Sequence, residues 1–232
     1  MKVAREVRVL FLVATLGAWL AYQFCGLYCA LPFIAIALVI PYVFRDPQCH
    51  IPPVPLAVVS PVYGRVSGIE DVIDPYLGRE ALRIIIRMPI LGPYVLRSPI
   101  EGRVMQQWHL SKGLDTQLMN NVDADVLMRY PDARQGRYAI WIQTDERDDV
   151  VVVLRGALIT RRLQCIVHVG ERIGQGKRCG LIQFPATVEV FMPINSRKDV
   201  RQGDSVRAGS AIIANLIHKS AESAAMVSET SA

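Results

Sequence analysis

The pattern of apolar and polar residues changes once along the chain, near residue 44. From Val9 to Phe44 there are 36 residues without a charged side chain, whereas apolar and polar residues alternate over short stretches afterwards. A membrane-spanning helix needs about 20 apolar residues, so the first run is too long for one helix and short for two full spans. Gly26 and Pro32 offer a break. The pattern predicts a helical hairpin that dips into one leaflet or barely crosses; one tilted span with an interfacial piece is the alternative.

Basic residues flank the apolar run on both sides. Lys2, Arg5 and Arg8 precede it, and Arg45 follows it. Because loops rich in Lys and Arg stay on the cytoplasmic side, both ends are expected on the cytoplasmic face of a membrane. The run is more than twice as long as the apolar region of a signal peptide, and no clear A-x-A cleavage site follows it. We therefore expect this segment to remain attached.

The rest of the chain is predicted to be mainly β. Short runs rich in β-branched residues are bounded by Gly, Pro, Asp or Asn, which is typical of strands. The clearest runs are 82–88, 138–144, 150–154 and 187–192. A weak amphipathic pattern at 120–129 predicts one short helix.

Two motifs occur twice in this β-rich part. S-P-x-x-G-R-V begins at Ser60 and again at Ser98, and V-x-x-G-[DE]-x-[IV]-x-x-G begins at Val167 and again at Val200. The first is a turn that leads into a strand, and the second is a pair of short strands with glycine turns. Together they resemble the two halves of the biotinyl and lipoyl carrier domains, which predicts a barrel-sandwich core. No E-A-M-K or D-K-A tip is present, so carrier chemistry is not expected.

The sequence thus divides into three parts. Residues 1–44 form the membrane-anchoring segment, residues 45–217 the β domain, and residues 218–232 a flexible polar tail. A length of 232 residues allows one sizeable domain with an attached element, whereas two full domains would be cramped.

Composition narrows the class of protein further. Hydrophobic residues make up 51% of the chain and charged residues 20%, which excludes a disordered or fibrous protein. The net charge is +5, and 21 of the 26 basic residues are arginine. This balance suits an anionic membrane surface. Without an RNP, helix-turn-helix or zinc-finger pattern, it does not predict nucleic-acid binding.

The cysteines and histidines predict neither disulfides nor a metal site. The five cysteines form no C-x-x-C pair, and an odd number in a chain of this length is not a disulfide framework. The four histidines do not fall at the spacing of metal ligands, so no bound metal is expected.

The order of these features resembles the short bacterial phosphatidylserine decarboxylases, including the archaetidylserine-type relatives. The likeness runs from the apolar segment to about Leu216, and its most specific stretch is 157–193. There the family shows I/L-A-R-R-I and then V-x-x-G-[DE]-R-x-x-x-G-x-R-x-G-x-I-R-F-G-S-R-V-D-V-Y-L-P. The resemblance implies the phosphatidylserine decarboxylase fold for the β domain, a place at the bacterial inner membrane, and a role in phospholipid biosynthesis.

The resemblance also implies a lyase that makes its own cofactor. In the family a serine attacks the carbonyl of the preceding glycine, the ester eliminates, and a pyruvoyl group caps the new chain. An Asp–His pair activates this serine, as a base-activated nucleophile requires. The pyruvoyl carbonyl then forms a Schiff base with phosphatidylserine and accepts the electrons released as CO₂ leaves.

This chain departs from the family at each of those positions. The Gly-Ser pair falls on Pro185 and Ala186, the aspartate on Tyr63, and the histidine on Tyr94. Of the histidine motif, Arg97 remains. Because the nucleophile and its activating pair are missing together, we expect a pseudoenzyme that does not cleave itself and has no pyruvoyl cofactor.

Several interpretations stay open at this point. Tyr63 and Tyr94 either fill the old pocket or, with Arg97, line a retained site for a phospholipid, including an anionic one, since arginine holds phosphate through its forked donors. A homodimer, or a heteromer with an active paralogue, is a further expectation. The function is regulatory or lipid-binding; the alternatives are an active decarboxylase with unconventional residues, for which Thr187 is the nearby hydroxyl, and a non-enzymatic membrane scaffold.

Overall fold

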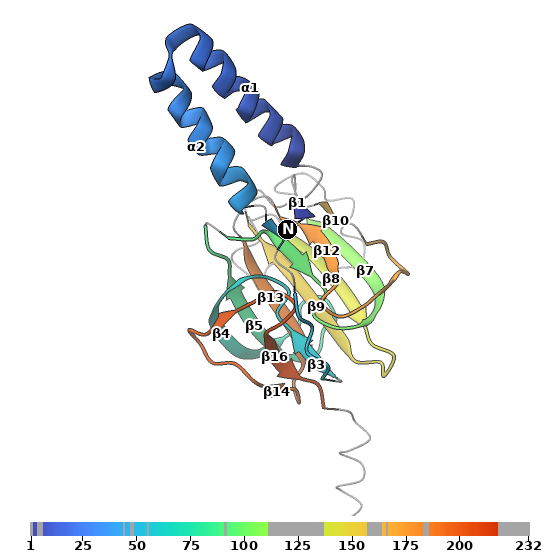
Figure 1. The fold of residues 1–232 in the computed structure, drawn as a ribbon. Coiled ribbons are helices and arrows are strands. Elements are labelled where there is room, and N and C mark those ends of the chain that lie inside the picture. Colours follow the sequence, from blue (N-terminus) through green and yellow to red (C-terminus); the bar gives the residue numbers. More distant parts are fainter. Residues whose placement is uncertain are drawn as a thin grey trace, which may run out of the picture.

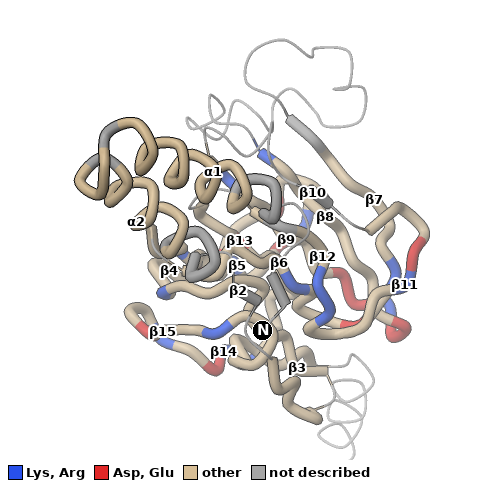
Figure 2. Tube along the Cα trace, turned by 45° about the horizontal axis from the view of Figure 1, so that its top comes forward, with Lys and Arg blue, Asp and Glu red and all other residues tan. Residues whose placement is uncertain are grey.

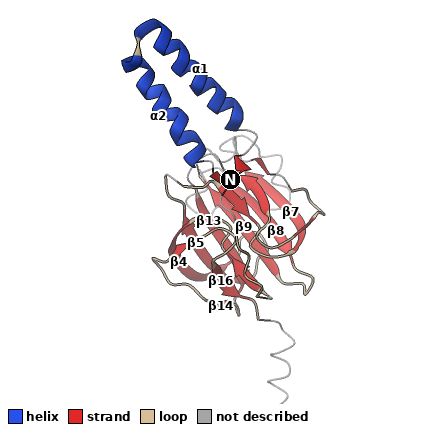
Figure 3. Ribbon diagram, viewed as in Figure 1, coloured by secondary structure: helices blue, strands red, loops and turns tan. Residues whose placement is uncertain are grey.

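The computed structural model describes most of the chain. Within the described residues the protein is mainly β, with two helices beside the strands (Figures 1 and 3). The predictions for a helix at 120–129, for Pro185 and for the tail at 218–232 lie outside the described residues. The described residues are 2–3, 7–43, 45–46, 49–54, 56–90, 92–110, 137–156, 164–165, 167–182 and 186–217.

The two helices follow one another with a single glycine between them. They are α1 (Val7–Cys25) and α2 (Leu27–Val43), and they lie side by side, extending away from the strands (Figure 1). Gly26 has a φ of 80°, a conformation that residues with a Cβ rarely adopt, so the first helix ends there. Pro32, the other predicted break, lies within α2. Among the described helices, none combines the length and the apolar character needed to cross a membrane.

The helices pack through small residues and expose their large ones. Ala14, Ala30 and Ala37 are buried, while Phe24 and Tyr28 are 84% and 88% exposed. In a globular protein in water, large apolar side chains are instead collected into the core. Small residues at the contact and large ones outside are typical of helices that pack within lipid. Other outward-facing apolar residues are Leu12, Val13, Leu16 and Leu38.

In the described part of the chain, eight strands form one antiparallel sheet, here called the large sheet. Its four central strands coincide with the four predicted runs, which confirms those predictions. From one edge to the other, the strands are β11 (Arg172–Ile173), β7 (Gly102–Leu110), β8 (Arg137–Gln143), β9 (Asp149–Arg155), β13 (Thr187–Pro193), β5 (Glu80–Arg87), β4 (Gly64–Ile73) and β15 (Ser205–Val206).

Shorter strands complete the described β structure. Two small sheets have three strands each among the described residues, and a two-strand pairing lies beside the helices (Figure 1). The first small sheet has the order β10 (Gln164–Cys165), β12 (Arg178–Leu181), β6 (Val95–Arg97), and the second β14 (Arg197–Lys198), β16 (Ile212–Asn215), β3 (Ala57–Val59). The two-strand pairing joins β1 (Lys2–Val3) and β2 (Arg45–Asp46).

The repeated motifs form two equivalent halves that exchange hydrogen bonds. The backbone N–H of Val59 donates to the carbonyl of Pro99 at 2.8 Å, and the equivalent N–H of Arg97 donates to Pro61 at 2.8 Å. Each half also places a glycine turn on its Ser-Pro turn. The order of the large sheet is therefore symmetric about β9 and β13, with β8 matching β5, β7 matching β4, and β11 matching β15.

The glycine turns dock on the Ser-Pro turns in the same way in both halves. The N–H of Gly209 donates to the Ser60 carbonyl at 2.7 Å, and the N–H of Gly176 donates to the Ser98 carbonyl at 2.8 Å. Both glycines have positive φ, 71° and 68°, which explains why the motif keeps glycine there. The sequence repeat is thus a structural repeat.

The main core lies on one face of the large sheet. Successive side chains of a strand point to opposite faces. In β5, Leu82, Ile84 and Ile86 are fully buried in the main core, while the residues between them face the other side. The same alternation places Val188 in the main core and Thr187 on the opposite face, here called the outer face, which carries a second, smaller cluster of buried residues that includes Phe191.

We predict that Gly64 and Gly68, both in β4, differ in their tolerance of a side chain. A Cβ at Gly64 would lie 2.5 Å from the Arg87 carbonyl oxygen, so the backbone must shift, whereas a Cβ at Gly68 would meet Ile85 Cδ1 at an ordinary 3.4 Å. Gly64→Ala should lower the free energy of unfolding by about 1–3 kcal/mol. Gly68→Ala, the matched control, should cost less than about 1 kcal/mol. Thermal unfolding of the full chain in mild detergent, followed by circular dichroism, measures both; equal losses contradict the prediction.

Candidate functional site

The end of β5 is the common neighbour of the predicted site positions. Gly64, directly after Tyr63, packs closely against the carbonyl of Arg87. The carbonyl of Ala186 accepts a hydrogen bond from the N–H of Met88 at 3.0 Å. The hydroxyl of Tyr94 donates to a carbonyl in the same segment, two residues further on. Three positions far apart in the sequence are therefore brought to one place, while Pro185 lies outside the described residues.

Ala186 contributes packing to this place and no reactive group. Its side chain is 5% exposed and belongs to the main hydrophobic core. The neighbouring hydroxyl, on Thr187, extends to the outer face of the large sheet because side chains alternate along a strand. Neither Ala186 nor Thr187 therefore supplies a hydroxyl at the place where the family resemblance requires a serine nucleophile.

Tyr94 is held as a buried hydrogen-bond donor. Its side chain is 4% exposed, and its hydroxyl donates to the carbonyl of Ile90. Burial raises the pKa of the Tyr94 hydroxyl above its usual value, so the group keeps its proton at neutral pH. A protonated phenol cannot remove a proton from a nucleophile, which is the task of the histidine implied at this position. Tyr63 is half-buried in the first Ser-Pro turn.

Arg97 is engaged with the glycine turns. Its Nη1 donates to the carbonyl of Gly176 at 2.8 Å, and its Cδ would lie 2.9 Å from a Cβ at Gly209. In β6 the core-facing Leu96 precedes it, so Arg97 points to the other side of the strand. This side chain therefore supports the contact between the two halves. A role for Arg97 in binding lipid stays a prediction.

A row of arginines lies across the large sheet at the end of β5, and the sequence did not predict it. Arg65 lies opposite Arg87 in the β4–β5 pairing, and Arg87 lies opposite Thr187. On the far side of Thr187 the row continues with Arg155 and Arg137. The sequence shows an arginine after the glycine of each Ser-Pro motif, but the register that aligns these residues is a property of the folded sheet.

A cavity of about 600 Å³ lies elsewhere in the described part of the chain. Its lining is partly apolar, with Ile51, Leu56 and Leu216, and it includes the carboxylates of Glu101 and Asp145. None of the four described site positions lines it. The cavity is therefore distinct from the place where Tyr63, Tyr94 and Ala186 gather.

Comparisons with known proteins agree with the motifs. The family described as phosphatidylserine decarboxylase matches residues 36–214. A phosphatidylserine decarboxylase proenzyme of Nitrosomonas europaea is 33% identical over 205 residues, covering 88% of this chain and 91% of the relative. The proenzyme of Nitrosomonas eutropha is 34% identical over 212 residues (91% and 94%), and that of Burkholderia cenocepacia 33% over 214 residues (92% and 96%).

We predict that the effect of Tyr94→Phe on the free energy of unfolding depends on pH. At pH 8 the loss of the bond to Ile90 should lower the free energy of unfolding by about 0.5–1.5 kcal/mol. Because the pKa of Tyr94 is raised in the folded protein, the wild-type protein loses stability as pH rises through the unfolded-state value near 10, and the phenylalanine variant lacks this loss. The stability gap should therefore narrow above pH 10.

Chemical denaturation at pH 8 and at pH 10.5 measures this gap. Tyr28→Phe is the control, since the Tyr28 side chain is 88% exposed, and it should change stability by less than about 0.5 kcal/mol. A gap for Tyr94→Phe that widens with pH contradicts the prediction.

Proposed function

The chain belongs to the phosphatidylserine decarboxylase family, and we propose that it is a member that has lost the decarboxylase reaction. The observation that carries this proposal is alanine at residue 186, with its methyl group packed in the core. The relatives are named proenzymes, and the family resemblance requires a serine at this position. An alanine side chain cannot attack a carbonyl, so the residues present do not fit the formation of a pyruvoyl group.

The activating pair supports the same proposal. Tyr63 and Tyr94 occupy the positions implied for aspartate and histidine, and the Tyr94 hydroxyl is already donated to a backbone carbonyl. Thr187 is an unsuitable replacement for the serine because it extends to the outer face of the large sheet. A nucleophile, its base and the partner of the base act as one unit, so their joint replacement removes the reaction.

We also propose the barrel-sandwich assignment for the β domain. Its support is the internal symmetry of the strands, in which each half carries a Ser-Pro turn, a glycine turn and a small sheet. This symmetry is the one expected from the carrier-like motifs.

We propose that residues 1–44 hold the protein at the cytoplasmic face of the bacterial inner membrane. The support is the distribution of residues on α1 and α2, with small residues between the helices and large apolar ones outside. Leaving such a surface in water costs about 25 cal/mol for each Å² of apolar area, a cost that lipid removes. A contiguous apolar surface of this kind marks a membrane or partner contact.

The role that follows is lipid binding or regulation within phospholipid metabolism, with membrane phospholipid as the partner. An active enzyme with unconventional residues would cleave itself in the first experiment below. A scaffold without a lipid site would bind no phospholipid in the lipid-binding test of the next subsection. Assembly as a homodimer or with an active paralogue stays a prediction.

We predict that the purified chain remains one polypeptide. Mass spectrometry under denaturing conditions should give the intact mass, because residue 186 has no hydroxyl. Ala186→Ser should also stay intact, since Tyr63 and Tyr94 cannot activate the new serine. The relative from Nitrosomonas europaea, a named proenzyme, is the positive control for processing. A C-terminal fragment that begins at residue 186 and carries a pyruvoyl group overturns the proposal.

We predict that the full chain stays with the membrane after carbonate washing. Phe24→Asp/Tyr28→Asp places two charges on the most exposed apolar side chains of the helices and should move most of the protein to the supernatant. Val169→Asp/Ile217→Asp is the matched control, because it adds the same charge at exposed apolar residues of the β domain and should change nothing. Release of the wild-type protein by carbonate contradicts membrane anchoring.

A further inference from the structure

Arg65 and Arg87 form a pair of like charges on two neighbouring strands. They are direct partners in the antiparallel pairing of β4 and β5, so their side chains lie on the same face. Both side chains are exposed. Like charges directly opposite one another destabilise a sheet. A pair of arginines in this position therefore requires compensation.

Two other arginines of the neighbourhood have a carboxylate partner. Arg83, in the same two strands, lies opposite Glu70 and forms an ion pair with it. Arg155, further along the row, forms an ion pair with Glu189. For Arg65 and Arg87, no carboxylate among the described residues lies within ion-pair distance.

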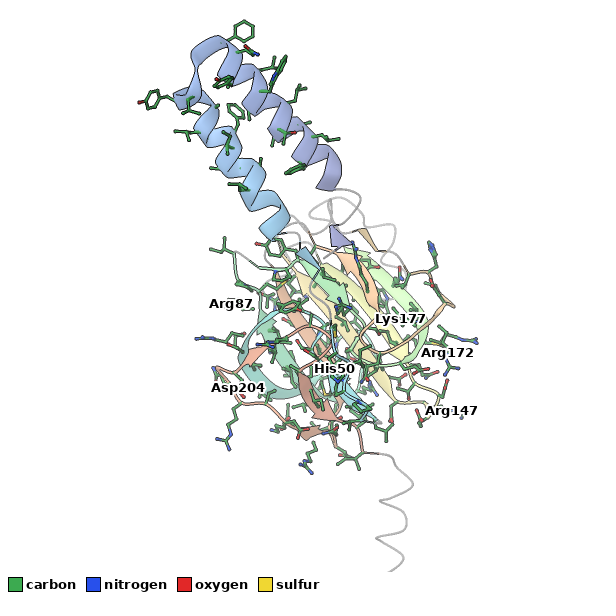
Figure 4. All side chains as sticks on the ribbon, viewed as in Figure 1. His50, Arg87, Arg147, Arg172, Lys177 and Asp204 are labelled. Atoms are coloured by element: carbon green, nitrogen blue, oxygen red, sulfur yellow. The ribbon has the colours of Figure 1, made fainter. Side chains whose placement is uncertain are left out.

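The position of Arg65 and Arg87 in the fold indicates which anion offsets their repulsion. Arg87 ends β5, and Figure 4 shows it toward the end of the β domain from which α2 extends, whereas Arg147 lies toward the opposite end. In Figure 2 the tube carries blue Lys and Arg segments near the labels of β4 and β15. If the helices enter a membrane, as proposed above, the pair lies at the level of the lipid headgroups.

We propose that Arg65 and Arg87 bind the phosphate group of an anionic membrane phospholipid. Partners in an antiparallel pair have Cα atoms about 4.5–5.5 Å apart, so two guanidinium groups can reach one phosphate. Each presents a planar fork of N–H donors that matches the phosphate oxygens. The inference rests on the proposed membrane anchoring for the orientation of the lipid.

This site is distinct from the degenerate site. Arg87 lies opposite Thr187, on the outer face of the large sheet, whereas Ala186 and Val188 face the core. A lipid phosphate bound by the arginine pair therefore does not occupy the position of the lost nucleophile. It fixes the height and orientation of the β domain at the membrane surface.

The test uses the full chain in a neutral detergent, titrated with phosphatidylglycerol, with phosphatidylcholine, and with inorganic phosphate. Native mass spectrometry counts bound lipid, and thermal unfolding reports stabilisation. The wild-type protein should bind phosphatidylglycerol and rise in Tm, with little response to phosphatidylcholine. Arg65→Gln/Arg87→Gln should weaken phosphatidylglycerol binding about tenfold or more, as expected for the loss of charge-assisted hydrogen bonds.

Two further variants make the result specific. Arg147→Gln/Arg197→Gln removes the same charge at exposed residues outside the pair and should bind like the wild-type protein. Arg65→Lys/Arg87→Lys keeps the charge without the forks and should bind with intermediate strength. Without lipid, Arg65→Gln/Arg87→Gln should be at least as stable as the wild-type protein because the repulsion is gone, so lost binding cannot be attributed to unfolding.

The following outcomes overturn the proposal. One is equal binding of phosphatidylglycerol by the wild-type protein and Arg65→Gln/Arg87→Gln. Another is an equal loss in Arg147→Gln/Arg197→Gln, which indicates general attraction. A third is stabilisation by inorganic phosphate that phosphatidylglycerol does not reproduce, which indicates a site for a free anion. Because the assay is in detergent, failure of membrane anchoring appears only in carbonate washing and is distinguishable from failure of this site.

Discussion

The exchange of backbone hydrogen bonds between the two Ser-Pro turns is the constraint on which the rest of this structure depends. Val59 donates to Pro99 and Arg97 donates to Pro61, so each half closes on the turn of the other. Buried backbone groups need partners, and the carbonyls of Pro61 and Pro99 find theirs in the opposite half. These exchanged hydrogen bonds fix where β4 and β7 begin, directly after the two turns. The two halves then meet at β9 and β13, in the centre of the large sheet.

The same constraint explains how the chain keeps its fold with a different set of site residues. Around the end of β5, the backbone carbonyls of Tyr94 and Ala186 accept hydrogen bonds from the N–H groups of Ile182 and Met88. Such bonds do not depend on the side chain. The sheet around the site positions can therefore form with alanine at residue 186 and tyrosine at residue 94.

Local sequence patterns predicted the helices and strands of this fold well, but they did not predict the register between neighbouring strands. The β-branched runs became β5, β8, β9 and β13, the repeated motifs became the two halves, and Gly26 ends the first helix, because each signal acts over a few residues. The pairing of Arg65 with Arg87 depends on register across a sheet, which no local pattern specifies. The histidine motif groups Arg97 with Tyr94, and only the folded chain shows that Arg97 donates to the carbonyl of Gly176, which is distant in sequence.

The internal symmetry gives each half the same backbone and leaves the side chains at matching positions to diverge. Where the first half has Tyr63, the second has Glu101, and where the first has Ser205, the second has Arg172, which forms ion pairs with Glu101 and Asp145. The ion pairs of Arg172 thus have no counterpart at Ser205 in the first half. A duplicated fold can in this way evolve a new surface in one copy while its twin preserves the architecture that both require.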